Sequence, residues 1–234
     1  MPPRTPARAT RKPQPAAAPA RRRRPEEVKA RILQAALNTF ATHGFDGATV
    51  AMIAEHANVK VSLLLYHFQS KELLWKALVN DLADKSPLLH ILDDEEQQHA
   101  SVREKLRAVI RRVVESSAAA PNLHLLMTQE ARKPSERLMW LCETWIRKDF
   151  EKLCELIRAG QKEGSVRDVN PARLRYAIVA ISAVPFSVAA EYQYLTQRDP
   201  FSRAEIENAI EFIERLVFND SAAKTPAAGR RRKR

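Results

Sequence analysis

Glycine, cysteine and long apolar runs are scarce in this sequence, and each shortage excludes a class of protein. The 234 residues include five glycines, none in a GxGxxG or GxxxxGK[ST] pattern, which argues against the common nucleotide-binding architectures. Cys142 and Cys154 would lie about 18 Å apart on one helix, too far to pair, so we expect no disulfide. The longest apolar stretch, residues 176–190, falls short of the ~20 residues that span a bilayer. With no signal peptide at the Arg- and Pro-rich N-terminus, these features predict a cytoplasmic protein.

Patterns typical of catalytic and metal sites are also missing. The six histidines form no HxxxH, HExxH or Cys–His spacing, and there is no GxSxG. The acidic run 93–96 is interpreted as a solvated linker rather than a pair of catalytic carboxylates. We therefore expect neither an enzyme nor a bound metal or cofactor.

Positive charge is concentrated at the two ends of the chain. Residues 1–24 hold eight basic and no acidic side chains, and residues 221–234 hold six basic and no acidic ones. Because the net charge is +11, residues 25–220 carry −3. Basic tails favour a polyanion partner, nucleic acid first and a membrane surface second, although tails that only improve solubility would look the same.

Apolar periodicity and capping residues predict an all-α protein of about nine helices, four before an acidic linker and five after it. Gly44 and Gly160 are expected to end helices, Asn170-Pro171 to begin one, and Pro185 to kink it. Residues 1–24 are expected to form a basic disordered arm, and residues 25–84 a DNA-binding domain built on a three-helix helix-turn-helix unit. Residues 85–220 would form a helical regulatory and dimerisation domain, and residues 221–234 a basic disordered tail.

Residues 50–68 carry a helix-turn-helix pattern. Ala54 is small where two helices must approach closely, and Asn58 stands in the turn, where a left-handed residue is needed. A short second helix over residues 60–67 then has the size that the major groove admits. Leu63, Leu64 and Leu65 cannot all point inward on a helix, so at least one of them should be exposed.

Here the chain resembles the TetR family of bacterial transcriptional regulators, over residues 26–82. The matching residues are Ala41-x-x-Gly44-Phe45, Thr49-Val50, Ile53-Ala54, Ala57-Asn58-Val59, Leu64, Phe68 and Ser70-Lys71. The sequence departs from the family pattern at Asn58, where glycine is usual, and at Leu65, where tyrosine is common. Over residues 100–218 the resemblance is limited to the number and length of the helices.

The resemblance and the chemistry of the side chains together predict a set of DNA-binding residues. A helix start suits a phosphate, apolar side chains suit thymine methyl groups, and a basic arm can enter the minor groove or add only non-specific affinity. The expected DNA contacts are Arg21, Arg22, Arg23, Arg24, Thr49, Lys60, Val61, Ser62, Leu63, Tyr66, His67 and Lys71.

The resemblance also implies that the C-terminal half forms a homodimer and binds a small apolar or aromatic effector. A stretch that is apolar nearly all round and a striped last helix suit a dimer contact through Ile178, Ile181, Val188, Ile206, Ile210, Ile213 and Val217. The candidate pocket residues are Met127, Trp140, Trp145, Phe150, Phe186 and Tyr192, each of which also suits plain core packing.

The function predicted from these features is a ligand-responsive repressor that binds a palindromic operator as a homodimer and is released by a small molecule. Its partners would be double-stranded DNA, the effector and a second copy of the chain, and no membrane. Three alternatives remain open: a DNA-binding or nucleoid-type protein without an effector, an enzyme with an incidental helical head, and a membrane-surface protein that uses only its tails.

Overall fold

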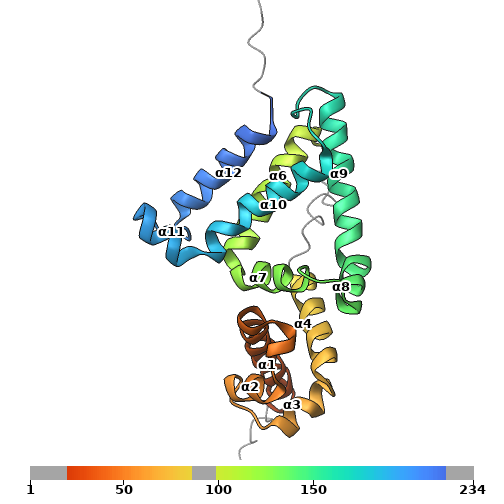
Figure 1. Ribbon diagram of the computed structural model, residues 1–234, viewed down its shortest axis with the longest axis vertical. Coiled ribbons are helices and arrows are strands. Elements are labelled where there is room, and N and C mark those ends of the chain that lie inside the picture. Colours follow the sequence, from red (N-terminus) through yellow and green to blue (C-terminus); the bar gives the residue numbers. More distant parts are fainter. Residues whose placement is uncertain (1–19, 86–98, 220–234) are drawn as a thin grey trace, which may run out of the picture.

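The computed structural model describes residues 20–85 and 99–219, and all named elements in these ranges are helices (Figure 1). Apart from an isolated bridge between Val166 and Phe218, these ranges hold no β-structure, as expected for an all-α chain. The expectations for residues 1–19, most of the acidic linker and the basic tail after residue 219 fall outside the described residues.

The first part of the chain, the head, lies at the end of the molecule opposite α12 (Figure 1). It comprises α1 (Ala20–Gly47), α2 (Val50–His56), α3 (Val61–Phe68) and α4 (Lys71–Lys85). The remainder, the body, comprises α6 (Val102–Ala119), α7 (Pro121–Glu130), α8 (Glu136–Leu141), a π-helical turn (Cys142–Ile146), α9 (Arg147–Lys162), α10 (Pro171–Ser187), α11 (Ala189–Thr196) and α12 (Arg203–Val217).

Local chemistry sets most of the helix starts, as predicted. The side chains of Thr49, Ser101, Asn170 and Ser202 each accept a hydrogen bond from a backbone N–H in the first turn of the helix that follows. Ser101 and Glu104 form a complete capping box. These starts follow from a few neighbouring residues, and sequence alone is enough to locate them.

Two helix boundaries differ from the prediction. Helix α1 begins at Ala20, so Pro25 lies inside it and residues 20–24, expected to be disordered, are helical. Arginine is a good helix former, and a helix that has already nucleated extends cheaply toward its N-terminus. Gly160 does not end its helix, because α9 continues to Lys162; a Cβ at this position would lie 2.5 Å from Cγ2 of Val166, so this glycine permits a close approach instead.

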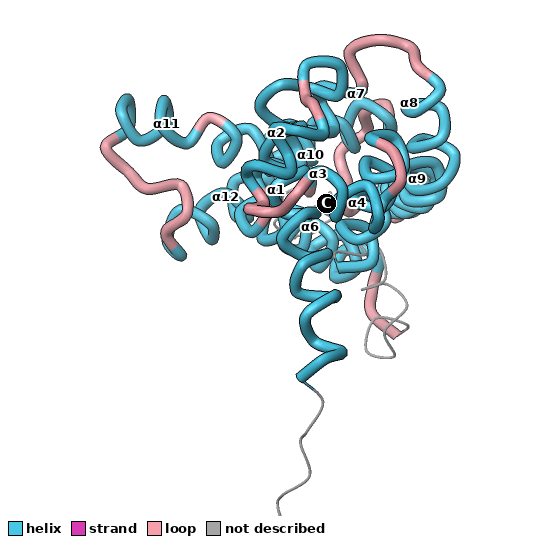
Figure 2. Tube along the Cα trace, turned by 90° about the horizontal axis from the view of Figure 1, so that it is seen from below, coloured by secondary structure: helices cyan, strands magenta, loops and turns pink. Residues whose placement is uncertain are grey.

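The segment after Asn170 was expected to be one helix kinked at Pro185, but it forms two helices, α10 and α11, that meet at a sharp bend. Helix α10 ends at Ser187, two residues after Pro185, and α11 leaves it at 79°. No described helix alone is long and apolar enough to cross a membrane, although α10 and α11 taken together pass that test by length and composition. Helix α11 contains no buried residue and projects beyond the rest of the body in both views (Figures 1 and 2).

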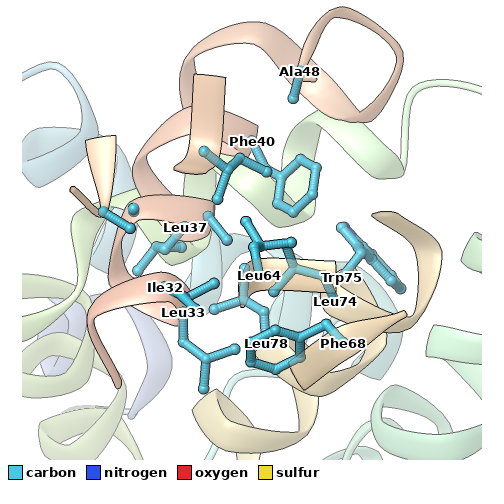
Figure 3. Packing of buried hydrophobic residues seen from close by; sticks show 14 of the residues in the cluster. Ile32, Leu33, Leu37, Phe40, Ala48, Leu64, Phe68, Leu74, Trp75 and Leu78 are labelled. Atoms are coloured by element: carbon cyan, nitrogen blue, oxygen red, sulfur yellow. The ribbon is translucent and has the colours of Figure 1, made fainter. Parts of the chain in front are cut away.

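Two apolar cores hold the described residues together. One is centred on the head, where Phe40, Leu64, Trp75 and Leu78 are almost fully buried (Figure 3). The other joins α6, α9, α10 and α12. The head core also includes Leu126 and Leu141 from the body, so helix packing continues across the boundary expected near residue 85.

Candidate DNA-binding surface

Helices α2 and α3 form the predicted helix-turn-helix. Ala54 is almost fully buried, and its carbonyl accepts a hydrogen bond of 2.9 Å from the backbone N–H of Val59. Asn58 adopts φ = 51°, the left-handed conformation that the turn requires. Asparagine therefore fulfils the backbone role for which glycine is usual in the family pattern.

Helix α3 has one buried and one exposed side. Leu64 and Phe68 point into the head core, whereas Leu63 and Leu65 are both exposed, which confirms that the three consecutive leucines cannot all be buried. The outer side also bears Val61 and Tyr66, and the Tyr66 side chain is 80% exposed. A short helix with an apolar, aromatic outer side has the shape and chemistry to read base edges in a major groove.

The other predicted contacts on α2 and α3 are accessible to different degrees. Thr49, Lys60 and Ser62 are exposed, and the Thr49 hydroxyl accepts from the backbone N–H of Met52 at 3.2 Å. His67 is half-buried, and its ring meets the Tyr66 ring edge-on at 5.4 Å.

Lys71 is more deeply engaged in the fold than the sequence suggested. Its Nζ donates hydrogen bonds to the carbonyl oxygens of Phe45 at 2.9 Å and Ala48 at 3.0 Å, and it lies 4.4 Å from the centre of the Phe45 ring. The ammonium group has one donor left for a phosphate. Lys71 thus fixes the corner between α1 and α2, a role that the linear sequence did not reveal because its partners lie more than 20 residues away.

The charge of residues 25–84 does not by itself favour DNA. Residues 25–84 contain seven acidic and five basic side chains, and Lys60 and Glu55 are the only charged residues between positions 49 and 70. The backbone of Arg21 to Arg24 belongs to α1, and their side chains are not described. The net positive charge of the chain therefore comes from residues 1–24 and 221–234.

The six candidate pocket residues do not surround a single cavity. Met127, Trp140 and Trp145 pack against the head core, and the indole N–H of Trp145 donates to the side-chain oxygen of Asn80 at 3.1 Å. Phe150 lies elsewhere, with its ring centre 6.4 Å from that of Tyr176.

Phe186 and Tyr192 line an open cleft of about 630 Å³ between α10, α11 and α12. The Tyr192 hydroxyl donates to Oε2 of Glu205 at 2.6 Å, and Arg198 donates to Oε1 at 3.2 Å. The hydrogen bond from Tyr192 is the main reason that the pKa of Glu205 lies below its ordinary value. These bonds secure α11 to the start of α12.

Most of the predicted dimer residues are buried within their own chain. Ile178, Ile210, Ile213 and Val217 form part of the body core, where α12 packs on α6 and α10, so they are not available to a partner. Ile181 and Ile206 pack against the same core and are half-buried. Val188 is the one member of the set that is exposed. The prediction was wrong for the buried four because an apolar stripe identifies a covered face but not what covers it.

A different pair of apolar stripes is exposed on the same two helices. On α10 and its C-cap, exposed apolar side chains recur every four residues, at Tyr176, Ala180, Val184 and Val188. On α12, Phe212 and Leu216 are exposed one turn apart. Exposed apolar side chains at this spacing, on two helices that pack against each other, are typical of a protein–protein contact.

Across residues 20–85 and 99–219, no three His, Cys, Asp or Glu side chains gather where they could hold a metal ion.

Two stretches of the chain match known family descriptions. Residues 32–78 match "Bacterial regulatory proteins, tetR family", and residues 103–217 match "Tetracyclin repressor-like, C-terminal domain". The chain is 27% identical over 192 residues to the HTH-type transcriptional regulator RutR of Escherichia coli (strain K12). The aligned residues cover 81% of this chain and 88% of RutR. It is 28% identical over 163 residues to the HTH-type transcriptional repressor SCO4008 of Streptomyces coelicolor, covering 68% and 79% of the two chains.

Solved structures share the fold at low sequence identity. AibR, in complex with isovaleryl coenzyme A and operator DNA, superposes with a TM-score of 0.64 at 19% identity, covering 82% of this chain and 98% of that one. A mutant of HlyIIR superposes with a TM-score of 0.64 at 21% identity, covering 87% and 100%.

Proposed function

Because the chain belongs to the TetR family of bacterial transcriptional regulators, we propose that it represses a gene by binding a palindromic operator as a homodimer. A two-fold dimer would place two α3 helices in successive major grooves, about one helical turn apart. A small molecule bound in the body would favour a head spacing that no longer fits the DNA, so effector and operator would each weaken the binding of the other.

The outer side of α3 carries this proposal. Val61, Leu63 and Tyr66 are exposed although they are apolar or aromatic, and the surface helix that holds them is anchored by Leu64 and Phe68. Three such residues on one short exposed helix serve no purpose in the packing of the head. Contact with base edges and thymine methyl groups explains their exposure.

A DNA-selection experiment followed by footprinting tests the proposal. The full-length protein is used to enrich a duplex from a random-sequence pool, and the selected duplex is then footprinted at low and physiological salt. We expect a protected palindrome that persists at physiological salt. Coverage that has no boundary and fades with salt would favour the nucleoid-type alternative, since phosphate contacts alone are strongly salt-dependent.

Replacing Tyr66 with alanine should reduce sequence discrimination. The side chain is 80% exposed, so its removal leaves the head core intact. We expect the affinity for the selected duplex to fall by about tenfold, while the affinity for a shuffled duplex of the same composition changes little. Fluorescence anisotropy titrations with both duplexes give the two affinities and the ratio between them. An equal loss on the two duplexes would contradict a role for Tyr66 in base recognition.

For the dimer, we propose the exposed apolar face of α10 and α12 as the contact. An isologous interface uses the same patch on both subunits, and two adjacent helices from each copy would form a four-helix contact. The stripe residues Val184 and Phe212 would lie within it. The cleft beside α12 continues this face, because Phe212 also lines it.

For the effector, we propose a small apolar or aromatic molecule bound by the body. Phe186 and Tyr192, which line the cleft of about 630 Å³ between α10, α11 and α12, supply suitable contacts. AibR, which shares the fold, was solved in complex with isovaleryl coenzyme A and operator DNA. Compounds that erase the footprint of the wild-type protein would identify the effector.

Replacing Arg21 to Arg24 with glutamine should weaken DNA binding most strongly at low salt. Glutamine keeps the helix propensity of this segment while it removes four positive charges that directly precede residues 25–84, which contain more acidic than basic residues. The loss of four phosphate contacts would make the negative slope of log K against log salt shallower by about 3.5. Affinity measured between low and physiological salt gives this slope.

The matched control replaces Arg230, Arg231, Arg232 and Arg234 with glutamine, an equal change in charge. If Arg21 to Arg24 form an arm that enters the minor groove, their replacement should cost more affinity for the selected duplex than the control does. Equal losses from the two variants would mean that both tails act only as diffuse positive charge.

A further inference from the structure

The corner between α1 and α2 is held from the body as well as from within the head. Phe45 lies at this corner, directly after Gly44, whose φ of 68° breaks the helix. The Phe40 ring stacks against the Phe45 ring with 5.8 Å between centres. Two cations also lie over the Phe45 ring: Nζ of Lys71 at 4.4 Å and the guanidinium carbon of Arg137 at 3.6 Å. Lys71 belongs to the head, whereas Arg137 belongs to α8 in the body, so one ring connects the two parts.

The body fixes the position of the Arg137 guanidinium. Its Nε donates to Oε2 of Glu130 at 3.2 Å, and the Ser135 hydroxyl donates to Oε1 of the same carboxylate at 2.6 Å. Only 5% of the Glu130 side chain is exposed. Ser135 is also the N-cap of α8. The corner between α7 and α8 therefore presents Arg137 to Phe45 in a defined orientation.

On the head side, the same ring is linked to the start of the helix-turn-helix. Lys71 donates to the carbonyl oxygens of Phe45 and Ala48, and Ala48 directly precedes Thr49, the N-cap of α2. A movement of Phe45 would thus shift the beginning of α2, and α3 would follow because Val59 is hydrogen-bonded to α2.

Helix α7 packs closely on α1 next to this corner. The side-chain N–H of Gln129 donates to the carbonyl oxygen of Ala41 at 3.2 Å. A Cβ added at Gly44 would lie 3.2 Å from Oε1 of Gln129. The contact leaves little freedom for α7 to slide without moving the end of α1.

We propose that Arg137 is a positioning residue for DNA recognition: it holds Phe45, and through Phe45 and Lys71 it sets the orientation of α2 and α3 relative to the body. The proposal rests on the proposed function and adds the route by which a movement of α7 and α8 would reach α3. Arg137 itself does not contact DNA in this scheme.

The test uses the full chain with the double substitution Glu130→Gln and Arg137→Met. Both changes together remove the guanidinium over Phe45 without leaving a buried charge unpaired, and methionine preserves apolar contact with the ring. The matched control is Arg132→Met, which removes an exposed cation only five residues from Arg137. The readouts are affinity for the selected and shuffled duplexes, the salt slope of each, and amide hydrogen exchange over residues 49–68.

We expect the double variant to bind the selected duplex about tenfold more weakly than the control, with unchanged affinity for the shuffled duplex, an unchanged salt slope and faster exchange over residues 49–68. Equal losses on both duplexes with a lower slope would overturn the proposal by making Arg137 a phosphate contact. Unchanged affinity and exchange would also overturn it. If the wild-type protein selects no duplex, the proposed function fails, and faster exchange over residues 49–68 in the double variant alone would still support the positioning role.

Discussion

Replacement of Arg137 by alanine alone is expected to lower the free energy of unfolding by about 3 kcal/mol. The substitution removes the Nε donor to Glu130 and the guanidinium that lies 3.6 Å from the centre of the Phe45 ring. The carboxylate of Glu130 would stay buried with the Ser135 hydroxyl as its remaining donor from the α7–α8 corner. A buried charge that loses its partner costs more than the pair contributed, and this asymmetry makes the effect large.

Urea unfolding followed by circular dichroism at a fixed protein concentration measures this loss, because the stability of a dimer depends on concentration. The double variant Glu130→Gln with Arg137→Met should recover most of it, since neither residue then carries a charge. A single variant as stable as the wild type would show that water reaches Glu130 freely. A double variant no more stable than Arg137→Ala would show that the stacking on Phe45, rather than the ion pair, is the stabilising contact.

Replacement of Phe212 by glutamate should weaken the proposed dimer by at least about thirtyfold. The Phe212 side chain is 54% exposed on α12, so the monomer should tolerate the change, whereas a dimer would have to bury the new carboxylate without a partner. Val184 is 45% exposed on the neighbouring stripe, and Val184→Glu should act in the same direction. Sedimentation equilibrium gives the association constants.

Arg158→Gln on α9 is the matched control for Phe212→Glu, because the residue is exposed and the net charge changes by the same amount. Loss of the dimer should also reduce affinity for the selected duplex, since joining the two heads gives the second half-site a high effective concentration. If Phe212→Glu and Val184→Glu both dimerise as tightly as Arg158→Gln, this face is not the dimer contact. The assignment of α3 to DNA binding would be unaffected by that result.

The helix-turn-helix could be predicted almost completely from the sequence because its determinants are local. Thr49 as N-cap, Asn58 in the left-handed turn and the inward pair Leu64 and Phe68 all follow from spacing within about 20 residues. Lys71 was placed correctly at the start of α4, yet its bonds to Phe45 and Ala48 were not foreseen. Nothing in a linear pattern links residues that meet only when α4 packs on α1.

In the body, the sequence was even less able to predict which residues meet. The stripe of α12 that contains Ile210 and Ile213 is apolar at helical spacing, but the sequence does not say whether α6 or a second copy covers it. Likewise, the six aromatic and apolar residues suitable for a pocket belong to separate regions, because each comes from a different element between α7 and α11.

The sequence by itself therefore determined the all-α class, most of the helix starts, the helix-turn-helix and the family, because periodicity, capping and turn chemistry act over a few neighbouring residues. Only the tertiary structure decided which apolar stripes are buried within the chain, how the head core extends into the body, and how Arg137 and Lys71 come to lie over one phenylalanine ring. These features depend on the packing of helices distant in sequence, and their contacts leave no local pattern.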